Sequence, residues 1–284
     1  MSVPAELLVT PERLAQLMAA ERCVVVDCRF DLTDAAKGRQ DYLAGHIPGA
    51  QYAHLDEDLA SSMTPASGRH PLPEPEDFSA FLSHIGWCDD KLLVAHDDRN
   101  NAMAVRLWWL MRHFGQPAAL LDGGLEAWSR AGMPLDTGAV ESPPAPIPVL
   151  RGDAAMTVSA TDILDDLAHA TLTLIDARAP ERYSGAVEPL DARAGHIPGA
   201  RNRPFALNLD GSGRFKPAQQ LRREFEELLQ QRPLHSVVHT CGSGVTACHN
   251  RFAMELAGMG ASRIYPGSWS EWARDESRPI ETSV

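Results

Sequence analysis

The chain has little positive charge for its length. Its 26 lysine and arginine residues are outnumbered by 38 aspartate and glutamate residues, which leaves a net charge of −12. A negative protein repels phosphate backbones and anionic lipid headgroups, so neither nucleic acid nor a membrane surface is an expected partner. Any anionic substrate must instead be held by a local group of basic side chains.

Secretory and membrane segments are also missing from the sequence. No stretch approaches the roughly 20 apolar residues that a membrane-spanning helix needs. Residues 1–8 have no basic start followed by an apolar core, so no signal peptide is expected. The five cysteines are odd in number and sparse, which fits a reducing compartment better than a disulfide framework. These features predict a cytoplasmic globular protein.

What the sequence does contain is a long tandem repeat. The hexapeptide Gly-His-Ile-Pro-Gly-Ala occurs at residues 45–50 and again at residues 195–200. Other short matches follow at nearly the same spacing, and so long a period indicates two domains rather than a solenoid. We predict a first domain at residues 1–137 and a second at residues 157–284, joined by a proline-rich linker at residues 138–156.

Each half alternates short apolar strands with helical segments. In the first half we expect strands at 23–26, 92–95 and 118–121, with a helix at 102–114. In the second half we expect strands at 172–175, 236–239 and 263–265. Continuous apolar strands alternating with amphipathic helices are typical of a mostly parallel sheet covered on both faces. The predicted fold class is therefore α/β.

The two halves differ most at one loop. Residues 241–246 read Cys-Gly-Ser-Gly-Val-Thr, whereas the register-matched residues 97–102 of the first half contain no cysteine. Cys241 follows an apolar strand, and the glycines permit a tight turn before the next helix. Inward-facing N–H groups and the helix N-terminus favour negative charge. We therefore expect Cys241 to exist largely as a reactive thiolate, and a persulfide on it to be stabilised in the same way.

Residues that both halves share are expected to serve the fold. His46 and His196 lie in the repeated hexapeptide, and an Asp-x-Arg motif at 27–29 recurs at 176–178. Since only one half carries the cysteine, these pairs are interpreted as structural. Cys248 is expected to be a packing residue, and the histidines and cysteines of residues 239–249 do not have the spacing of a zinc site.

Together these motifs resemble the tandem-domain rhodanese-type sulfurtransferases, and among them the 3-mercaptopyruvate sulfurtransferases. The resemblance rests on both hexapeptides, the cysteine loop and the closing Gly-Ser-Trp-Ser-Glu-Trp at 267–272, and it covers nearly the whole chain. It implies two rhodanese-like domains, the first non-catalytic and the second catalytic. It also implies attack by Cys241 on the sulfur of a small anionic donor, giving a Cys241 persulfide and pyruvate. No metal or organic cofactor is expected, and cyanide or a thiol acceptor such as thioredoxin or glutathione then removes the sulfur.

Charge in the cysteine loop separates the variants of this family. Thiosulfate-specific members resemble Cys-Arg-Lys-Gly-Val-Thr, in which two cations suit a dianionic donor. Gly242 and Ser243 replace those cations here, so the loop is neutral and favours a monoanionic donor such as 3-mercaptopyruvate. A thiosulfate:cyanide sulfurtransferase and a non-catalytic persulfide carrier stay open as alternatives. A phosphatase with a Cys-x5-Arg loop is disfavoured because Ala247 stands in the place of the arginine.

The resemblance also assigns supporting residues. Arg182 lies where the family places an anion-binding arginine, and Arg193 is the candidate for a second one. Three residues match a Ser-His-Asp relay that orients the serine and handles protons, namely Ser243, His70 and Asp56. Further substrate contacts are expected from the rest of the loop, at Gly242, Gly244, Val245 and Thr246.

Overall fold

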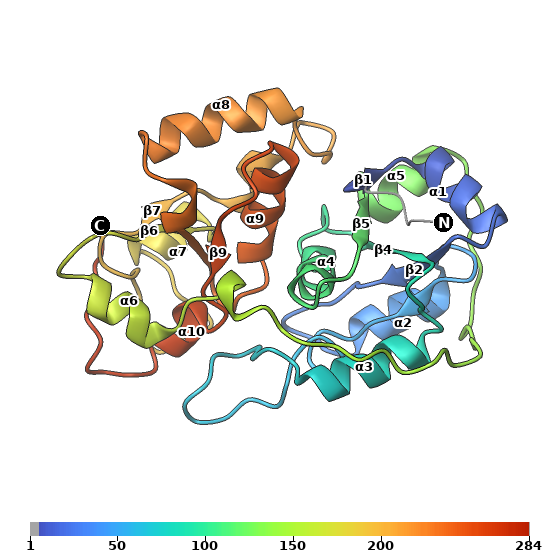
Figure 1. Cartoon of the computed structure of the whole chain (residues 1–284), viewed down its shortest axis with the longest axis horizontal. Coiled ribbons are helices and arrows are strands. Elements are labelled where there is room, and N and C mark those ends of the chain that lie inside the picture. The colour runs from blue at the N-terminus through green and yellow to red at the C-terminus, as the bar shows by residue number, and fades with distance from the viewer. Residues whose placement is uncertain (1–5, 284) are drawn as a thin grey trace. The chain divides into compact units, whose positions relative to one another are not determined.

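The computed structural model describes residues 6–283, which form two compact units (Figure 1). The first unit comprises residues 6–61, 72–153 and 212–214, and the second comprises residues 62–71, 154–211 and 215–283. Residues 1–5, part of the stretch in which no signal peptide is expected, lie outside the described residues, as does residue 284. Across the described residues, no helix combines the length and the apolar character needed to cross a membrane.

The first unit is built on a parallel five-stranded sheet in the order β1-β5-β4-β2-β3. Its strands are β1 (Leu8–Val9), β2 (Cys23–Asp27), β3 (Gln51–Tyr52), β4 (Leu92–His96) and β5 (Ala118–Leu121). Its helices are α1 (Pro11–Ala19), α2 (Lys37–Ala44), α3 (Pro75–His84), α4 (Ala104–His113) and α5 (Gly124–Arg130). The strand order places β4 in the middle of the sheet, where it is buried along its whole length.

Apolar side chains that alternate along the strands build the core of the first unit. Leu14 and Leu17 of α1 and Trp128 of α5 join Val25 and Val94 in one buried cluster. Helix α4 packs against β4 and β5, and almost all of its residues are buried. Helices therefore flank the sheet, as predicted.

The second unit repeats this plan with a parallel four-stranded sheet in the order β7-β6-β8-β9. Its strands are β6 (Thr173–Asp176), β7 (Arg201–Asn202), β8 (Val237–Thr240) and β9 (Arg263–Ile264). Its α-helices are α6 (Ala160–Asp166), α7 (Pro180–Ser184), α8 (Ala218–Leu229), α9 (Ala247–Leu256) and α10 (Ser268–Trp272), and its 3-10 helices are η1 (Ala154–Met156), η2 (Phe205–Asn208) and η3 (Leu234–Ser236).

The core of the second unit is formed in the same way. Ile163 of α6 and the tryptophans Trp269 and Trp272 of α10 join Leu174 and Val238 in a buried cluster. Helix α9 packs against β8 and β9, and α8 packs on α9 (Figure 1). The predicted α/β class, with two parallel sheets flanked by helices, is confirmed.

The repeated hexapeptides make the same contacts in both units. His46 Nδ1 donates to the carbonyl of Tyr42 (2.9 Å), and His196 Nδ1 donates to the carbonyl of Tyr183 (2.8 Å). Each histidine ring also stacks on the ring of the tyrosine to which it donates, with ring centroids 4.2 Å apart for His46 and 3.8 Å apart for His196. Because a catalytic and a non-catalytic copy would not need identical active-site contacts, this agreement supports a structural role for both histidines.

The Asp-x-Arg motifs are structural by the same reasoning. Arg29 pairs with Asp27 (2.7 Å) and donates to the Gly45 carbonyl (2.7 Å), at the start of the first hexapeptide. Arg178 pairs with Asp176 (2.7 Å) and donates to the Gly195 carbonyl (2.8 Å). Each buried arginine thus connects the end of a sheet strand to the hexapeptide of its own unit.

Candidate active site

The cysteine loop lies at the carboxyl edge of the second sheet, the edge at which open parallel sheets place their ligand sites. Cys241 directly follows β8, and helix α9 begins at Ala247 after the loop. The Gly244 N–H donates to Cys241 Sγ (3.2 Å), and Cys241 is only 1% exposed. Gly244 has φ +78°, and a Cβ there would lie 2.2 Å from the Pro266 carbonyl oxygen, so only glycine fits. The turn thus aims a backbone donor at the sulfur, as predicted from the glycines.

The backbone of Cys241 is held by the start of α10. Ser268 Oγ accepts the Cys241 N–H (3.1 Å) and donates to the Tyr265 carbonyl (2.9 Å). The Trp269 N–H donates to the Cys241 carbonyl (3.0 Å), so both backbone groups of the cysteine are paired. Ser268 is fully buried and has φ +52°, a left-handed conformation that strains any residue with a Cβ.

Sequence reasoning missed Ser268, although a signal was present. The register-matched residue of the first unit is Gly124, which also has positive φ (+58°). A serine in place of a glycine at a left-handed position indicates that the hydroxyl compensates for the strain.

The structure brings Ser243 and His70 together within the second unit. His70 Nδ1 lies 2.7 Å from Ser243 Oγ, and the two side chains are 5% and 6% exposed. Asp56 belongs to the first unit, where its N–H donates to His54 Nδ1 (3.3 Å). Two of the three residues expected to form the relay are therefore in contact, and the part of Asp56 stays a prediction.

The segment Ser62–Pro71, which carries His70, is held on the second unit by backbone contacts. The Arg69 N–H donates to Ser270 Oγ (3.0 Å), and Arg274 Nη1 donates to the Thr64 carbonyl (2.7 Å). A Cβ at Gly68 would lie 2.5 Å from the Gly267 carbonyl oxygen, so the chain passes very close to the start of α10. This close approach sets the position of the His70 ring beside the loop.

Two guanidinium groups lie beside Gly242. A Cβ on this glycine would be 3.1 Å from Arg69 Nη2 and 3.4 Å from Arg182 Nη1. Arg182 was expected here, whereas sequence reasoning did not single out Arg69. Arg193 donates instead to the carbonyls of Asp275 (2.9 Å) and Arg278 (3.0 Å), which ties its side chain to the C-terminal segment.

Carboxylates compensate the charge of these arginines. Arg182 Nη2 lies 2.6 Å from Glu188 Oε1 and 3.5 Å from Asp191 Oδ2. Asp191 also pairs with Arg69, and Glu188 also lies 3.4 Å from Arg178 Nη1. Burial raises the pKa of Asp191; the Arg69 cation opposes that rise and the Glu188 carboxylate adds to it. Arg182 Nε is buried without a hydrogen-bond partner among residues 6–283.

The last two loop residues lead into α9. The carbonyls of Val245 and Thr246 accept the N–H groups of Cys248 and His249, both at 3.1 Å. Val245 is buried. These contacts give both residues a role in starting the helix, and their contact with substrate stays a prediction.

In the first unit, the loop that matches the cysteine loop is filled by the side chain of Asp97. The Asp97 carboxylate accepts four backbone N–H groups at 2.7–2.9 Å, from Arg99, Asn101, Met103 and Ala104. Burial raises the pKa of Asp97, and the four N–H donors oppose that rise. The first unit therefore keeps an anion-binding turn but occupies it with a carboxylate instead of a sulfur.

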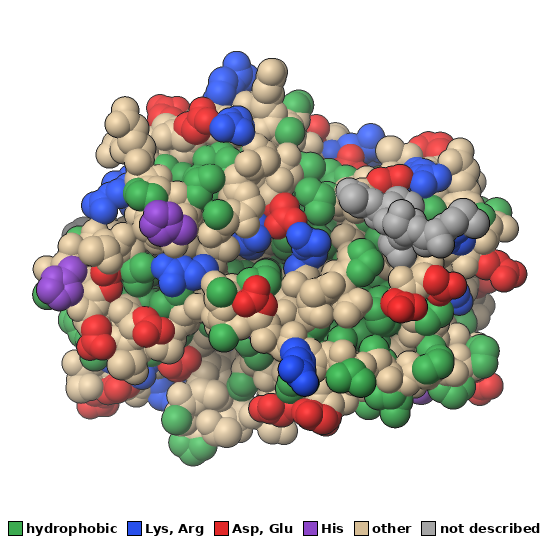
Figure 2. Space-filling model, viewed as in Figure 1, with side chains coloured by type: hydrophobic (Ala, Val, Ile, Leu, Met, Phe, Trp, Pro, Cys, Tyr) green, Lys and Arg blue, Asp and Glu red, His purple; other side chains and the backbone are tan. Residues whose placement is uncertain are grey.

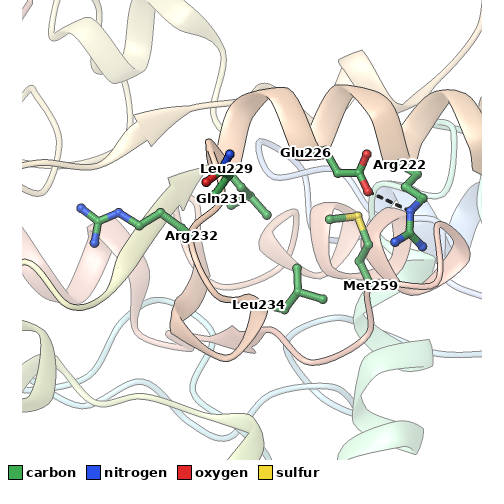
Figure 3. A pocket seen from close by; sticks show the side chains of 7 residues that line it. All are labelled: Arg222, Glu226, Leu229, Gln231, Arg232, Leu234 and Met259. Atoms are coloured by element: carbon green, nitrogen blue, oxygen red, sulfur yellow. Dashed lines mark hydrogen bonds and ion pairs between the residues drawn. The ribbon is translucent and has the colours of Figure 1, made fainter.

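A cavity of about 360 Å³ in the second unit lies at the opposite edge of the sheet (Figure 3). Leu229 at the end of α8, Leu234 before β8 and Met259 before β9 form its apolar side, with Arg222 and Arg232 near its rim. Because these residues precede the strands, the cavity is at the amino edge. It is therefore separate from the cysteine loop.

Comparison with known proteins agrees with these features. The model of the rhodanese-like domain matches residues 10–131 and 159–275. A Pseudomonas aeruginosa protein named as a probable 3-mercaptopyruvate sulfurtransferase is 43% identical over 97% of this chain and 98% of its own length. A Mycobacterium tuberculosis protein that carries the name thiosulfate sulfurtransferase is 35% identical over 99% and 98% of the two chains.

Solved structures give the same result. The crystal structure of the 3-mercaptopyruvate sulfotransferase SseA from Escherichia coli matches with a TM-score of 0.78 and 32% identity, over 93% of this chain and 99% of that one. Both halves of the chain, its fold and its relatives therefore agree with the resemblance drawn from the sequence. The chain belongs to the rhodanese family and is a sulfurtransferase.

Proposed function

We propose that this sulfurtransferase moves sulfur from 3-mercaptopyruvate, through a persulfide on Cys241, to a thiol acceptor or cyanide. The observation that carries the proposal is the neutral loop around Cys241, with the Ser243–His70 pair on it and two guanidinium groups beside it. The names of the Pseudomonas aeruginosa and Escherichia coli relatives support the same donor.

The proposed first step forms a sulfur–sulfur bond and breaks a carbon–sulfur bond. The Cys241 thiolate attacks the sulfur of the donor, and the electron pair of the C–S bond goes to carbon, giving the enolate of pyruvate. The proton of the donor thiol is passed to the enolate, so pyruvate and a Cys241 persulfide anion are the products. The Gly244 N–H, which lies 3.2 Å from Cys241 Sγ, would stabilise the negative sulfur.

The Ser243–His70 pair is the proposed carrier of this proton. The Ser243 hydroxyl lies 2.7 Å from an imidazole nitrogen of His70, so a proton can pass directly between the two groups. This distance is within the range required for general acid–base catalysis. In this proposal the domain expected at residues 157–284 carries the cysteine, and the sequence region 1–137 contributes His70. Asp56 is proposed to orient the imidazole as the third member of the relay.

The donor carboxylate is assigned to Arg182 and Arg69. The side chains of Arg69 and Arg182 are 22% and 19% exposed, and both guanidiniums lie at Gly242. A guanidinium pair can receive a carboxylate with several charge-assisted hydrogen bonds. Arg193 is engaged by backbone carbonyls, so we assign the second cationic contact to Arg69 in its place.

The negative charge of the rest of the chain makes the pair formed by Arg69 and Arg182 important. Acidic and basic side chains are mixed over the face seen in Figure 2, and the net charge is −12. A small anion must therefore be held at the site by directed hydrogen bonds from the two arginines beside the loop, against the field of the whole protein.

Two other functions remain as alternatives. Thiosulfate:cyanide sulfurtransfer keeps the Cys241 chemistry and changes the donor, and the name of the Mycobacterium tuberculosis relative favours it. A non-catalytic persulfide carrier would keep Cys241 but would not need the contact between His70 and Ser243. Thioredoxin, glutathione or cyanide could remove the sulfur, because each can attack a persulfide.

The deciding experiment compares both donors on the purified protein. Pyruvate is followed from 3-mercaptopyruvate, and thiocyanate is followed from thiosulfate with cyanide. We expect a higher kcat/KM for 3-mercaptopyruvate, and no turnover of either donor by Cys241→Ser. A preference for thiosulfate would reject the proposed donor, and turnover by Cys241→Ser near the wild-type rate would reject the nucleophile.

A further inference from the structure

Asp191 occupies a central place in the charged cluster beside the cysteine loop. One of its carboxylate oxygens pairs with Arg69, and the other lies 3.5 Å from Arg182 Nη2. Its side chain is 7% exposed, so these contacts are shielded from solvent. The same two arginines are the ones whose guanidinium groups lie at Gly242. Asp191 therefore bridges both cations that face the proposed donor site.

The cluster has no net charge. Its guanidiniums are those of Arg69, Arg178 and Arg182, and its carboxylates are those of Asp176, Glu188 and Asp191. The loop adds no cation, since Gly242 and Ser243 are neutral. A ligand thus meets two oriented guanidiniums whose charge is already balanced by buried carboxylates.

We propose that Asp191 determines which donors the enzyme accepts, by positioning Arg69 and Arg182 while limiting the charge of the site to what a monoanion requires. This inference rests on the proposed function and deepens it, because it explains how a site with two arginines discriminates against a dianion. A monoanionic carboxylate needs the hydrogen bonds of the guanidiniums but little excess positive charge. A dianion such as thiosulfate brings a second negative charge close to Asp191.

The size of the effect follows from Coulomb's law. Interaction energy scales with the product of the charges, so removing one negative charge from the site strengthens binding of a dianion twice as much as binding of a monoanion. If monoanion binding improves about tenfold, dianion binding improves about a hundredfold. The ratio of the two specificities should then move about tenfold towards thiosulfate in Asp191→Asn.

The test measures kcat/KM for 3-mercaptopyruvate and for thiosulfate in four variants. Asp191→Asn removes the charge and keeps the shape, whereas Asp191→Glu keeps the charge and should retain a ratio close to that of wild type. Glu227→Gln removes one charge from an exposed position on α8 and is the control for total charge. Arg69→Gln removes a cation, so it should move the ratio away from thiosulfate. The shift in Asp191→Asn should also shrink at high salt, because screening weakens it.

A binding experiment separates this inference from the proposed turnover. Pyruvate and sulfate are titrated by calorimetry into Cys241→Ser and into Cys241→Ser/Asp191→Asn, since neither chain can form the persulfide. Sulfate binding should improve more than pyruvate binding, by about tenfold. A wild-type chain that turns over neither donor would refute the proposed function. The binding of pyruvate and sulfate would still test whether Asp191 controls the charge of the site.

Several results would overturn the role of Asp191. One is an Asp191→Asn ratio equal to that of wild type or of Glu227→Gln. Another is equal improvement of sulfate and pyruvate binding. If Asp191→Asn does not fold, the Arg69→Gln variant still tests the proposal. A ratio of the two kcat/KM values that is unchanged in this variant, or that moves towards thiosulfate, would reject charge balance as the basis of donor choice.

Discussion

The strained serine beside Cys241 gives the sharpest test of how the loop is held. In an ordinary helix, replacing an exposed residue by glycine costs about 1 kcal/mol more than replacing it by alanine. Ser268 is the first residue of α10, but its φ of +52° reverses this expectation. Glycine adopts a left-handed conformation without strain, whereas alanine keeps a strain of about 1 kcal/mol.

The magnitude can be worked from two hydrogen bonds. Ser268→Ala leaves the buried Cys241 N–H without its acceptor at 3.1 Å, which costs about 1–3 kcal/mol. It also removes the donor to the Tyr265 carbonyl at 2.9 Å, worth about 0.5–1.5 kcal/mol. We expect Ser268→Ala to lose about 2–4 kcal/mol of unfolding free energy. Ser268→Gly loses the same bonds but gains relief of strain, so it should be about 1 kcal/mol more stable than the alanine variant.

The assay is urea unfolding of the wild type and both variants, followed by thermal melting. A difference of 1 kcal/mol corresponds to a Tm shift of roughly 2–4 °C for a unit of this size. Both variants should also lose kcat/KM, because the Cys241 N–H is no longer held from α10. An alanine variant as stable as the glycine variant, or more stable, would show that Ser268 is not strained and would refute the reasoning.

Three further predictions concern the loops and their partners. Arg182→Ala should raise the KM for 3-mercaptopyruvate by roughly 10- to 150-fold, the equivalent of about 1.5–3 kcal/mol for a charged hydrogen bond; steady-state kinetics with an unchanged KM would reject its role. Ser243→Ala and His70→Gln should each lower kcat, and the double variant should be no worse than the more damaging single one, because the two side chains act as a pair; additive losses would contradict the relay. Asp97→Ala should lower the unfolding free energy by about 2–4 kcal/mol and Asp97→Asn by less, since asparagine still accepts some of the four N–H groups; equal losses in chemical denaturation would argue against the filled turn.

Much of the fold could be predicted from the sequence, because the longer strands are mostly apolar runs. The two-residue strands β1, β3 and β7 were not predicted, and β3 and β7 are Gln-Tyr and Arg-Asn. The strand expected at 118–121 is β5, and the other predicted strands agree with the structure within one residue at each end. The helix expected at 102–114 is α4 but is shorter at both ends. Asn100 and Asn101 have positive φ, so the chain is not helical just before α4, and the Asp97 carboxylate accepts the N–H groups of Met103 and Ala104 at the helix start.

The cysteine loop could be predicted, and its surroundings could not. Glycines next to Cys241 show in the sequence that the turn is tight, because the requirement is local. The contact of Arg69 with Asp191 joins residues 122 positions apart. Arg69 lies in a segment without helix or strand, so no periodicity indicates which way its side chain faces. Ser268 was missed for another reason, since the sequence offers only its register match with Gly124, and the positive φ that gives its hydroxyl a task is seen only in the structure.

The carboxylate of Asp97 has a consequence for how duplicated genes diverge. A loop of this kind gathers buried N–H groups, and each one that lacks an acceptor destabilises the fold. Asp97 accepts four buried N–H groups at once, so this loop satisfies its donors without a sulfur. Once the carboxylate is in place, a return to cysteine would have to compete with an anion that already satisfies the turn.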